Sequence, residues 1–276
     1  MAEKLLLTAG VDIGAATAKA AILSNNTLLS FSIIPTGHSV SQAGEFVLNS
    51  ALEKANISFN DLQRIISTGY GRRAVPFADK ALTEIICHAA GVNSILLSAR
   101  TIIDIGGQDS KVIGLDENGN VINFIMNDKC AAGTGRFLEV MAGVLDVKIN
   151  DIGPISLTGE NPCEISSTCT IFAESEVISL RAEGKSRENL LAGIHKAMSH
   201  RVAIMGKSVG FKEDIVFTGG VAKNIGIGKA MEEEIGFKIL TPEEPQIMGA
   251  LGAAILAKVD IERPKKMERS PRKVSR

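Results

Sequence analysis

Apolar and polar residues follow one another along this chain in an order that occurs twice. In each copy an apolar run, expected to form a buried strand, ends in Asp-Ile-Gly; two strand-like segments around a turn and an amphipathic helical stretch then follow. Each copy closes with another apolar strand that ends in Thr-Gly, at Thr68-Gly69 and at Thr218-Gly219. A repeat of one supersecondary unit predicts two similar α/β halves.

The repeat predicts matching elements at defined positions. The first copy is expected to hold strands over residues 18–23, 28–34 and 65–68 and a helix over residues 39–55. The second is expected to hold strands over residues 111–115, 121–126 and 215–218 and a helix over residues 131–145. Further helical stretches cover residues 82–92, 171–181 and 246–258.

Two halves of this kind predict a bilobal α/β protein. Ligands of α/β sheets bind outside the carboxyl ends of the strands, so all four glycine turns are expected to line a cleft between the lobes. We expect a first lobe of residues 1–98 with 246–260, a second lobe of residues 99–245, and a basic, disordered tail of residues 261–276. The second copy is the longer one, and its extra residues contain Cys163 and Cys169.

Composition and charge narrow the function classes. The 276 residues include no Trp and one Tyr, and the formal net charge is −1, so neither a stacking platform nor a broad basic field for nucleic acid is expected. No apolar run reaches the roughly 18 residues that span a bilayer. The first residues lack the pattern of a signal peptide, and a cytoplasmic protein that does not enter a membrane is expected.

The glycine turns predict a nucleotide site. Such turns let backbone N–H groups approach phosphate oxygens, and Asp12 and Asp104 at the strand ends are suited to hold Mg²⁺ through water. Gln108 follows the second turn and is placed to orient an attacking water, so Gln108, Asp104 and Asp12 are the candidate catalytic residues. The expected nucleotide-binding residues are Gly14, Ala15, Ala16, Thr17, Lys19, Gly106, Gly107, Gly219, Gly220, Val221, Asn224 and Gln246.

Two of the four cysteines predict a redox site. Cys130 and Cys169 each stand where a helix is expected to begin, and the N–H groups and dipole of a helix N-terminus stabilise a thiolate. Cys87 lies inside a helical stretch, which is typical of a buried structural thiol, and the role of Cys163 remains open. An iron–sulfur cubane takes four thiolates, so two per chain suggest one cluster shared across a homodimer.

The chain resembles a known family in several specific stretches between about Leu5 and Lys258. Its phosphate turns resemble those of the actin, Hsp70 and sugar-kinase superfamily. Within it, the chain closely resembles the activators (component A) of 2-hydroxyacyl-CoA dehydratases, in the same family as the ATPase subunits of benzoyl-CoA reductase. The stretches that carry the resemblance are Ser67-Thr-Gly-Tyr-Gly-Arg72, Glu84-Ile-Ile-Cys-His-Ala89, Asp104-Ile-Gly-Gly-Gln-Asp109, Asn127-Asp-Lys-Cys-Ala-Ala-Gly-Thr-Gly-Arg136, Ser166-Ser-Thr-Cys-Thr170 and Thr218-Gly-Gly-Val-Ala222.

The resemblance implies a duplicated actin-like (ribonuclease H-like) ATPase fold and a homodimer with one [4Fe-4S] cluster held by Cys130 and Cys169 of each chain. Binding and hydrolysis of ATP, with ADP and Mg²⁺ in the same site, would drive one electron from a ferredoxin- or flavodoxin-like reductant onto a partner dehydratase. One departure concerns the first turn, where Ala15 and Ala16 replace the hydroxyl residues usual in the family.

Two alternatives remain at this point. The first is an ATPase subunit of a benzoyl-CoA reductase-like complex, which would be isolated together with other subunits. The second, from a different class, is an actin-fold metabolite kinase or nucleotide switch whose cysteines are structural. It predicts a colourless protein, whereas the activator hypothesis predicts an iron–sulfur protein that needs Cys130 and Cys169.

Overall fold

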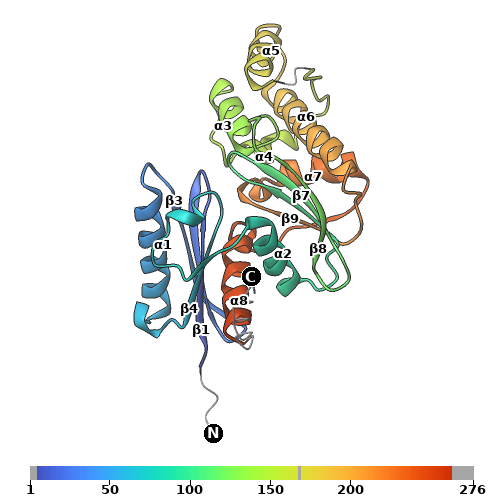
Figure 1. The fold of residues 1–276 in the computed structure, drawn as a ribbon. Coiled ribbons are helices and arrows are strands. Elements are labelled where there is room, and N and C mark those ends of the chain that lie inside the picture. Colours follow the sequence, from blue (N-terminus) through green and yellow to red (C-terminus); the bar gives the residue numbers. More distant parts are fainter. Residues whose placement is uncertain (1–4, 167–168, 263–276) are drawn as a thin grey trace, which may run out of the picture.

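Two five-stranded mixed sheets with related topology form the centre of the molecule, in a computed structural model that describes residues 5–166 and 169–262 (Figure 1). The first sheet has the order β3-β2-β1-β4-β5 and the second has the order β10-β9-β6-β7-β8. Most of the basic tail expected from residue 261 onward lies outside the described residues. The strands are β1 (Leu7–Ile13), β2 (Thr17–Ser24), β3 (Thr27–Pro35), β4 (Arg64–Thr68), β5 (Lys80–Ala81), β6 (Thr101–Ile105), β7 (Ser110–Leu115), β8 (Val121–Asn127), β9 (Ile215–Thr218) and β10 (Ile239–Leu240).

The register of the strands repeats between the sheets. Across the antiparallel pair β1–β2 Asp12 stands opposite Lys19, and across β6–β7 Asp104 stands opposite Lys111. The parallel neighbours agree as well, because Asp12 pairs with Thr68 and Asp104 with Thr218. The duplicated arrangement predicted from the two Asp-Ile-Gly segments is therefore present in the structure.

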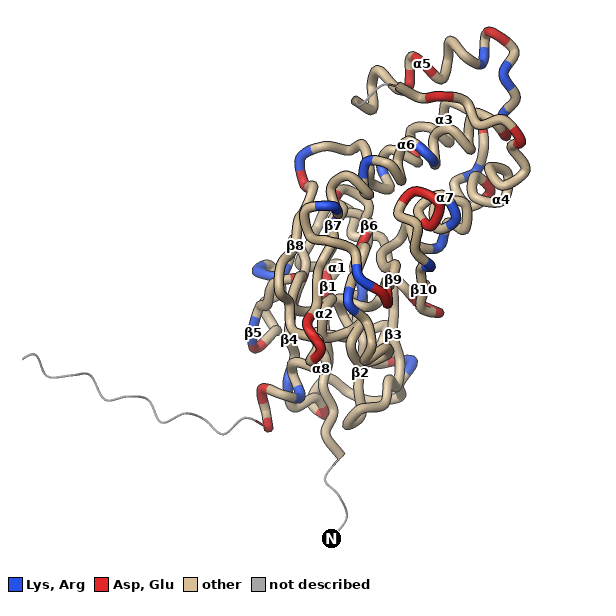
Figure 2. The backbone as a smooth tube through the Cα atoms, turned by 90° about the vertical axis from the view of Figure 1, so that its right-hand side faces the viewer, with Lys and Arg blue, Asp and Glu red and all other residues tan. Residues whose placement is uncertain are grey.

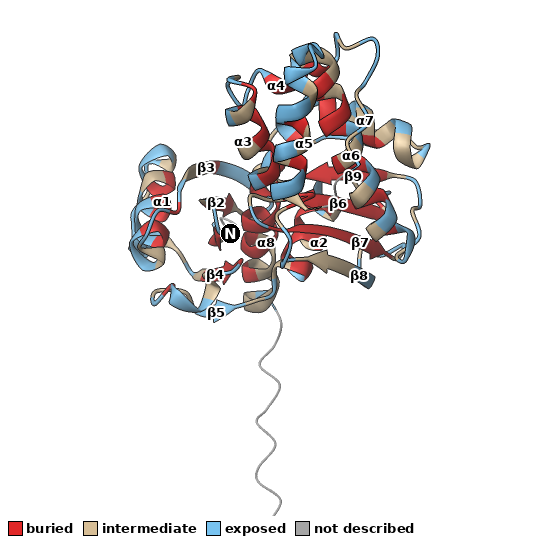
Figure 3. Ribbon diagram, turned by 90° about the horizontal axis from the view of Figure 1, so that it is seen from above, coloured by how far each residue is buried: buried red, intermediate tan, exposed pale blue. Residues whose placement is uncertain are grey.

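Helices cover both faces of each sheet. They are α1 (Val40–Ala55), α2 (Glu84–Ile95), α3 (Gly135–Val144), α4 (Ile152–Ser156), α5 (Thr170–Ala182), α6 (Arg187–Lys207), α7 (Ile225–Ile235) and α8 (Met248–Glu262). In Figure 1, α1 covers the outer face of the first sheet, α8 and α2 lie between the sheets, and α3, α4, α6 and α7 lie beyond the second. Figure 3 shows the second sheet and α8 mostly buried, whereas α1 and α5 expose much of their surface.

Helices α2 and α8 exchange sheets relative to their place in the chain. Helix α2 follows β5 of the first sheet, yet Ile85, Ala89 and Val92 pack in one core with Ile113 and Val216 of the second sheet. Helix α8 comes last in the described chain and packs against β1, β2 and β4 of the first sheet. Each sheet is therefore covered on one face by the helix that follows the last strand of the other sheet in the sequence.

The contact between α2 and α8 is made largely by backbone. A Cβ atom on Gly252 of α8 would lie 1.7 Å from the carbonyl oxygen of Cys87, and a Cβ atom on Gly91 of α2 would lie 2.1 Å from the carbonyl oxygen of Met248. Only glycine permits this approach, because any side chain at these two positions would overlap the facing helix. The Gly/Ala composition of the final helix thus has a packing cause.

Substitution Gly252→Ala is expected to lower the free energy of unfolding by about 1–3 kcal/mol, or more if the helices cannot separate, because the new methyl group overpacks the helix contact. Urea denaturation followed by circular dichroism measures the change. Gly228→Ala is the matched control, since a Cβ atom there, also inside a helix, meets nothing within 4 Å and alanine favours helix by up to about 1 kcal/mol. Equal stability of the two variants would contradict the tight contact.

Candidate functional site

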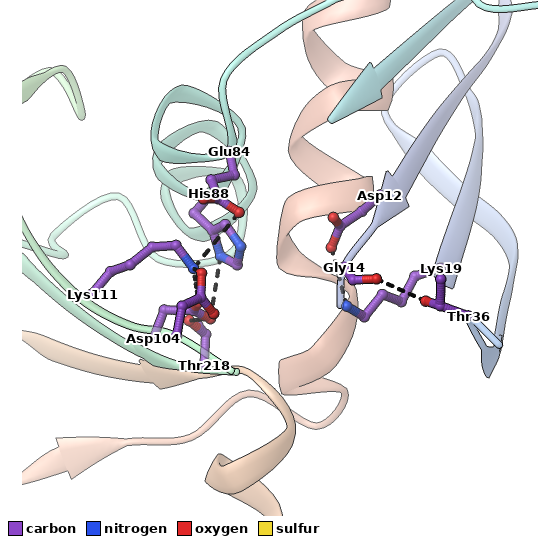
Figure 4. Close-up of polar contacts among 10 residues, drawn as sticks. Asp12, Gly14, Lys19, Thr36, Glu84, His88, Asp104, Lys111 and Thr218 are labelled. Carbon is purple, nitrogen blue, oxygen red and sulfur yellow. Dashed lines mark hydrogen bonds and ion pairs between the residues drawn. The ribbon is translucent and has the colours of Figure 1, made fainter. Parts of the chain in front are cut away.

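Two Asp–Lys pairs face each other across the space between the sheets (Figure 4). Lys19 Nζ donates to Asp12 Oδ2 at 3.3 Å, and Lys111 Nζ donates to Asp104 Oδ2 at 3.1 Å. All four side chains belong to strand positions that the repeated register fixes. The duplicated sequence pattern therefore yields two similar polar groups at the carboxyl ends of β1 and β6.

The pair in the second sheet is the more elaborate one. The Lys111 side chain is 2% exposed, and its Nζ lies 2.6 Å from Asp109 Oδ2 and 3.7 Å from Glu84 Oε2. Burial alone would lower the pKa of Lys111, but Asp104, Asp109 and Glu84 together raise that pKa above its ordinary value. Lys111 is thus a buried cation that neutralises a group of carboxylates.

Asp104 is the carboxylate with the most partners in this group. Thr218 Oγ1 donates to its Oδ1 at 2.8 Å, and His88 Nδ1 lies 3.5 Å from the same oxygen. Burial would raise the pKa of Asp104, but His88, Lys111 and the Thr218 hydroxyl hold that pKa below its ordinary value. Asp104 is therefore ionised over the physiological range, as a carboxylate that holds Mg²⁺ through water has to be.

A cavity of about 530 Å³ lies between these groups. Every non-cysteine residue that the sequence analysis selected lines it: Asp12, Gly14, Ala15, Ala16, Thr17, Lys19, Asp104, Gly106, Gly107, Gln108, Gly219, Gly220, Val221, Asn224 and Gln246. The structure thus brings together segments that are up to about 230 residues apart in the sequence. A volume of this size matches the small-molecule sites of other proteins.

The sequence reasoning missed part of this lining. The missed residues comprise polar groups at the Asp–Lys pairs, a further set from α3 to α4, and two residues that flank Asn224: Tyr70, Glu84, His88, Asp109, Lys111, Gly135, Leu138, Glu139, Ile149, Asn150, Pro154, Lys223 and Ile225. Glu84 and His88 stand in a stretch noted only for its resemblance to the family. The segment around α4 carried no signal, because a five-residue helix is too short for a periodic pattern.

Hydrogen bonds close the first glycine turn, and the two turns lie against each other. In the first, Gly14 N–H donates to Thr17 O at 3.0 Å, and Thr36 Oγ1 donates to Gly14 O at 2.8 Å. The turns also approach each other, since a Cβ atom on Gly107 would lie 2.6 Å from the Cβ of Ala16. Position 16 of this chain therefore contacts the second turn directly.

Asn224 is fixed by a buried histidine. Its Oδ1 accepts from the N–H groups of Gly226 and Ile227 and so caps α7, while its Nδ2 lies 3.0 Å from His195 Nε2. Burial lowers the pKa of His195 to about 4, so this imidazole is neutral at pH 7 and its Nε2 accepts the amide hydrogen. His195 and the two N–H groups of α7 together fix the orientation of the Asn224 amide.

The loop that carries Cys130 differs from the sequence-based expectation. A helix was expected from residue 131, but α3 begins at Gly135 with Thr134 as its N-cap, so the expectation that Cys130 lies at a helix N-terminus is wrong. The Asn127 side chain explains the difference, because its Oδ1 accepts from Cys130 N–H and its Nδ2 donates to Cys130 O, closing a turn before the helix. Cys130 is exposed in that turn.

The N-terminus of α3 is hydrogen-bonded to the second glycine turn. Gly135 N–H donates to Gly106 O at 2.8 Å, and Arg136 N–H donates to Gly107 O at 2.9 Å. These carbonyl groups satisfy two of the N–H groups that a helix start leaves without a partner inside the helix. The loop with Cys130 and the cavity between the glycine turns are therefore joined through one hydrogen-bonded segment.

Cys169 lies where it was expected, at the start of a helix. It is the N-cap of α5, with extended backbone angles, and its carbonyl accepts from Ala173 N–H. The preceding chain is anchored by Glu176, whose Oε1 accepts from both the N–H and the Oγ of Ser166. Ser167 and Thr168 of the same motif lie outside the described residues.

The other two cysteines differ from this pair. Cys87 is fully buried, and burial raises the pKa of its thiol to about 12, so it is protonated and inaccessible. Cys163 packs with its peptide group against Gly193 of α6, where a Cβ atom would lie 2.0 Å from Cys163 O. Its thiol is partly exposed.

Comparison with known proteins relates the chain to acyl-CoA dehydratase activators. The model of the BadF/BadG/BcrA/BcrD ATPase family matches residues 9–257. The chain is 46% identical over 253 residues to the 2-hydroxyisocaproyl-CoA dehydratase activator of Clostridioides difficile, covering 91% of this chain and 95% of that protein. It is 43% identical over 254 residues to the (R)-2-hydroxyglutaryl-CoA dehydratase activating ATPase of Acidaminococcus fermentans, covering 91% and 97%. One of the benzoyl-CoA reductase subunits of Thauera aromatica is 32% identical over 263 residues, covering 91% and 93%.

Solved structures agree with these relationships. The C. difficile activator with bound ADPNP superposes with a TM-score of 0.88 at 44% identity, covering 96% of this chain and all of that one. Component A of the A. fermentans dehydratase gives a TM-score of 0.91 at 42% identity, covering 94% of this chain and all of that one. The duplicated actin-like fold expected from the sequence is confirmed. Within the described residues, the helices are too short or too polar to cross a bilayer.

Proposed function

The chain belongs to the BadF/BadG/BcrA/BcrD ATPase family, and we propose that it is an ATP-dependent activator of a 2-hydroxyacyl-CoA dehydratase. The observation that carries this proposal is the cavity between the two glycine turns, in a chain 42–46% identical to three dehydratase activators. Lower identity, 32%, relates it to the benzoyl-CoA reductase of T. aromatica, which makes a reductase partner the second choice. A 2-hydroxyacyl-CoA dehydratase is therefore the proposed partner of this protein.

The chain binds ATP, as the likeness to an ADPNP-bound relative supports. Asp12 and Asp104 are the residues suited to hold Mg²⁺ through water, and Lys19, 13% exposed and beside the first turn, is suited to meet a phosphate oxygen. Gln108 lines the same cavity and is exposed, so its amide is free to orient an attacking water. These assignments make the two turns a clamp for the phosphates of ATP and ADP.

A [4Fe-4S] cluster fits the thiols of Cys130, which is exposed, and Cys169, which is partly exposed. Thiolates are the ligands that such clusters take, and Cys169 at the N-terminus of α5 is electrostatically favoured for an anionic cluster. When bound, the cluster supplies one-electron chemistry at low potential. Asn127 fixes the backbone of Cys130, and Glu176 fixes Ser166, three residues before Cys169.

A homodimer is supported by the surface next to Cys169. Ile171, Phe172 and Ile178 of α5 are 70%, 68% and 44% exposed, although α5 is only 13 residues long. Large apolar side chains gathered on one helix mark an interaction surface. Figures 1 and 2 place α5 at one extremity of the molecule, where a second copy has unobstructed access.

The hydrogen bonds between the phosphate turn and α3 supply a route from nucleotide to cluster. A shift of the Gly106-Gly107 peptide groups on ATP binding or hydrolysis would move the start of α3 and with it the loop that carries Cys130. Because the turns of the two lobes are in contact at Ala16 and Gly107, lobe movement reaches the same segment. We infer that hydrolysis changes the exposure and potential of the cluster in this way.

Three further assignments belong to this proposal. They are a ferredoxin- or flavodoxin-like reductant, a cytoplasmic location, which suits free cysteines and an oxygen-labile cluster, and the lobe boundaries, residues 1–98 with 246–260 and residues 99–245. Helix α2 falls within residues 1–98 but packs against the second sheet. The lobe to which it belongs is therefore defined by the sheet with which it moves, and not by its place in the sequence.

The test begins with protein purified without oxygen. We expect about four irons and four sulfides per dimer, ATP hydrolysis, and ATP-dependent activation of a 2-hydroxyacyl-CoA dehydratase supplied with a low-potential reductant. A metal-free monomer that binds ATP would remove the activator proposal and favour a kinase or a nucleotide switch. Protein that contains the iron–sulfur cluster, co-purifies with reductase subunits and activates no dehydratase would favour the benzoyl-CoA reductase alternative.

A further inference from the structure

Glu84 lies between the two lobes, and none of the proposed assignments gives it a function. It is the first residue of α2, after the N-cap Thr83, and its side chain is 15% exposed and lines the nucleotide cavity. Figure 4 shows Glu84 and His88 reaching from α2 into the space between the Asp104–Lys111 pair and the Asp12–Lys19 pair. Glu84 therefore faces the region where the two turns would hold the terminal phosphate.

The carboxylate of Glu84 is the least engaged of those around Lys111. Lys111 Nζ lies 2.6 Å from Asp109 and 3.1 Å from Asp104, but 3.7 Å from Glu84, which is beyond hydrogen-bond distance. Among the described residues, the Glu84 carboxylate accepts no hydrogen bond of ordinary length. Its oxygens are therefore available to a water molecule in the cavity.

The surroundings also make Glu84 a stronger base than a surface glutamate. Burial is the main cause that raises its pKa, Asp109 and Asp12 raise it further, and Lys111 and His88 oppose the change without cancelling it. A carboxylate with a raised pKa accepts a proton more readily than one with an ordinary pKa. Asp109 and Asp12 belong to different lobes, so Glu84 responds electrostatically to both.

The other carboxylates that line the cavity, and the one tyrosine there, are poorly suited to the same task. Asp12 and Asp104 are engaged by lysines, and Asp109 is held by Lys111. Tyr70 has a pKa raised to about 12 and is protonated at neutral pH. Glu139 is half exposed and paired with Arg136.

We propose that Glu84 is the general base of ATP hydrolysis in this protein. This inference rests on the proposed ATPase function and deepens it. The oxygen of the water that Gln108 orients forms a bond to the γ-phosphorus, and the bond from that phosphorus to the β–γ bridging oxygen breaks, its electron pair leaving with ADP. One proton of the water passes to a Glu84 carboxylate oxygen and is then released with phosphate to solvent, so no further reactant is required.

The decisive variant is Glu84→Gln, which keeps the size of the side chain and removes the basic oxygen. We expect kcat for ATP hydrolysis to fall by about 100-fold or more, with the affinity for the non-hydrolysable analogue ADPNP unchanged. Glu53→Gln, the same change at an exposed position on α1, is the control and should leave both quantities as in the wild type. A role limited to packing or to pairing with Lys111 would not separate kcat from analogue affinity.

The outcomes are distinguishable. Hydrolysis by Glu84→Gln at the wild-type rate, or a loss of analogue affinity in proportion to the loss of kcat, would overturn the role of Glu84 alone. If Glu84→Gln does not fold, Glu84→Asp retains a carboxylate moved back by one methylene group, and it should fold and hydrolyse ATP slowly at normal analogue affinity; full activity of that variant would likewise argue against a positioned base. A wild-type protein that hydrolyses no ATP would instead overturn the proposed function.

Discussion

Replacing Cys130 or Cys169 by serine is expected to remove the iron and acid-labile sulfide from protein purified without oxygen. A cubane takes four thiolates, and in a symmetric dimer each single substitution deletes two of them. The folded chain should survive the change, because Cys130 is exposed in a turn and serine is a good N-cap at position 169. Iron and sulfide analysis, the visible absorption of the cluster and the molar mass by light scattering measure the effect.

Cys87→Ala provides the matched control for the cysteine experiment. Its thiol is fully buried against the helix contact and its pKa is raised to about 12, so iron content and dimer mass should stay at the wild-type values. Loss of iron from Cys87→Ala, or a full complement of iron in Cys130→Ser, would refute the shared-cluster assignment. Dependence on Cys163 would instead point to a cluster held within one chain.

Lys111→Met is expected to lower the free energy of unfolding by about 3–5 kcal/mol, because it leaves Asp104, Asp109 and Glu84 buried without their cation. Lys19→Met is the comparison. It breaks a single pair, with Asp12, whose lysine is 13% exposed, so its cost should be smaller. Urea unfolding at pH 7 measures both variants, and equal losses would show that the burial of Lys111 has no special energetic weight.

The cost of Lys111→Met should also depend on pH. The pKa of Asp104 is depressed in the folded wild type, so its contribution to stability is present above the ordinary pKa of an aspartate, about 3.9, and is lost as pH falls toward the folded value. In the variant, protonation at low pH neutralises the carboxylates, so the absence of the lysine then costs less stability. The difference in stability between wild type and variant should therefore shrink as the pH is lowered below about 4, and a constant difference would contradict the electrostatic explanation.

Much of the nucleotide site was predictable because its parts are local in sequence. Asp12 and Lys19 are seven residues apart on adjacent strands, and the same spacing in Asp104 and Lys111 fixes the same register. Alternation of side chains along a strand then decides which residues face the cavity. The repeat thus specified two turns and their carboxylates without knowledge of any long-range contact.

Other features of the site depend on contacts that a sequence pattern does not encode. The role of Glu84 follows from α2 crossing to the second sheet, which nothing in residues 82–92 indicates. Helix α3 starts later than its apolar pattern because Asn127, before the expected helix, binds the backbone of Cys130. The conformation of the Cys130 loop is thus set by hydrogen bonds from a side chain to the backbone, and such bonds override helical propensity.

The exchange of α2 and α8 between the sheets has a consequence for how the protein is made. During synthesis the strands of the first sheet leave the ribosome early, but the helix that covers their inner face, Met248–Glu262, follows only after nearly all of the second half. Domains fold as units once their segments are available, so the first sheet stays incomplete until that helix appears. An N-terminal fragment that stops before Met248 would leave one apolar face of the first sheet exposed to solvent. Chaperones are therefore expected to bind the growing chain mainly during that interval.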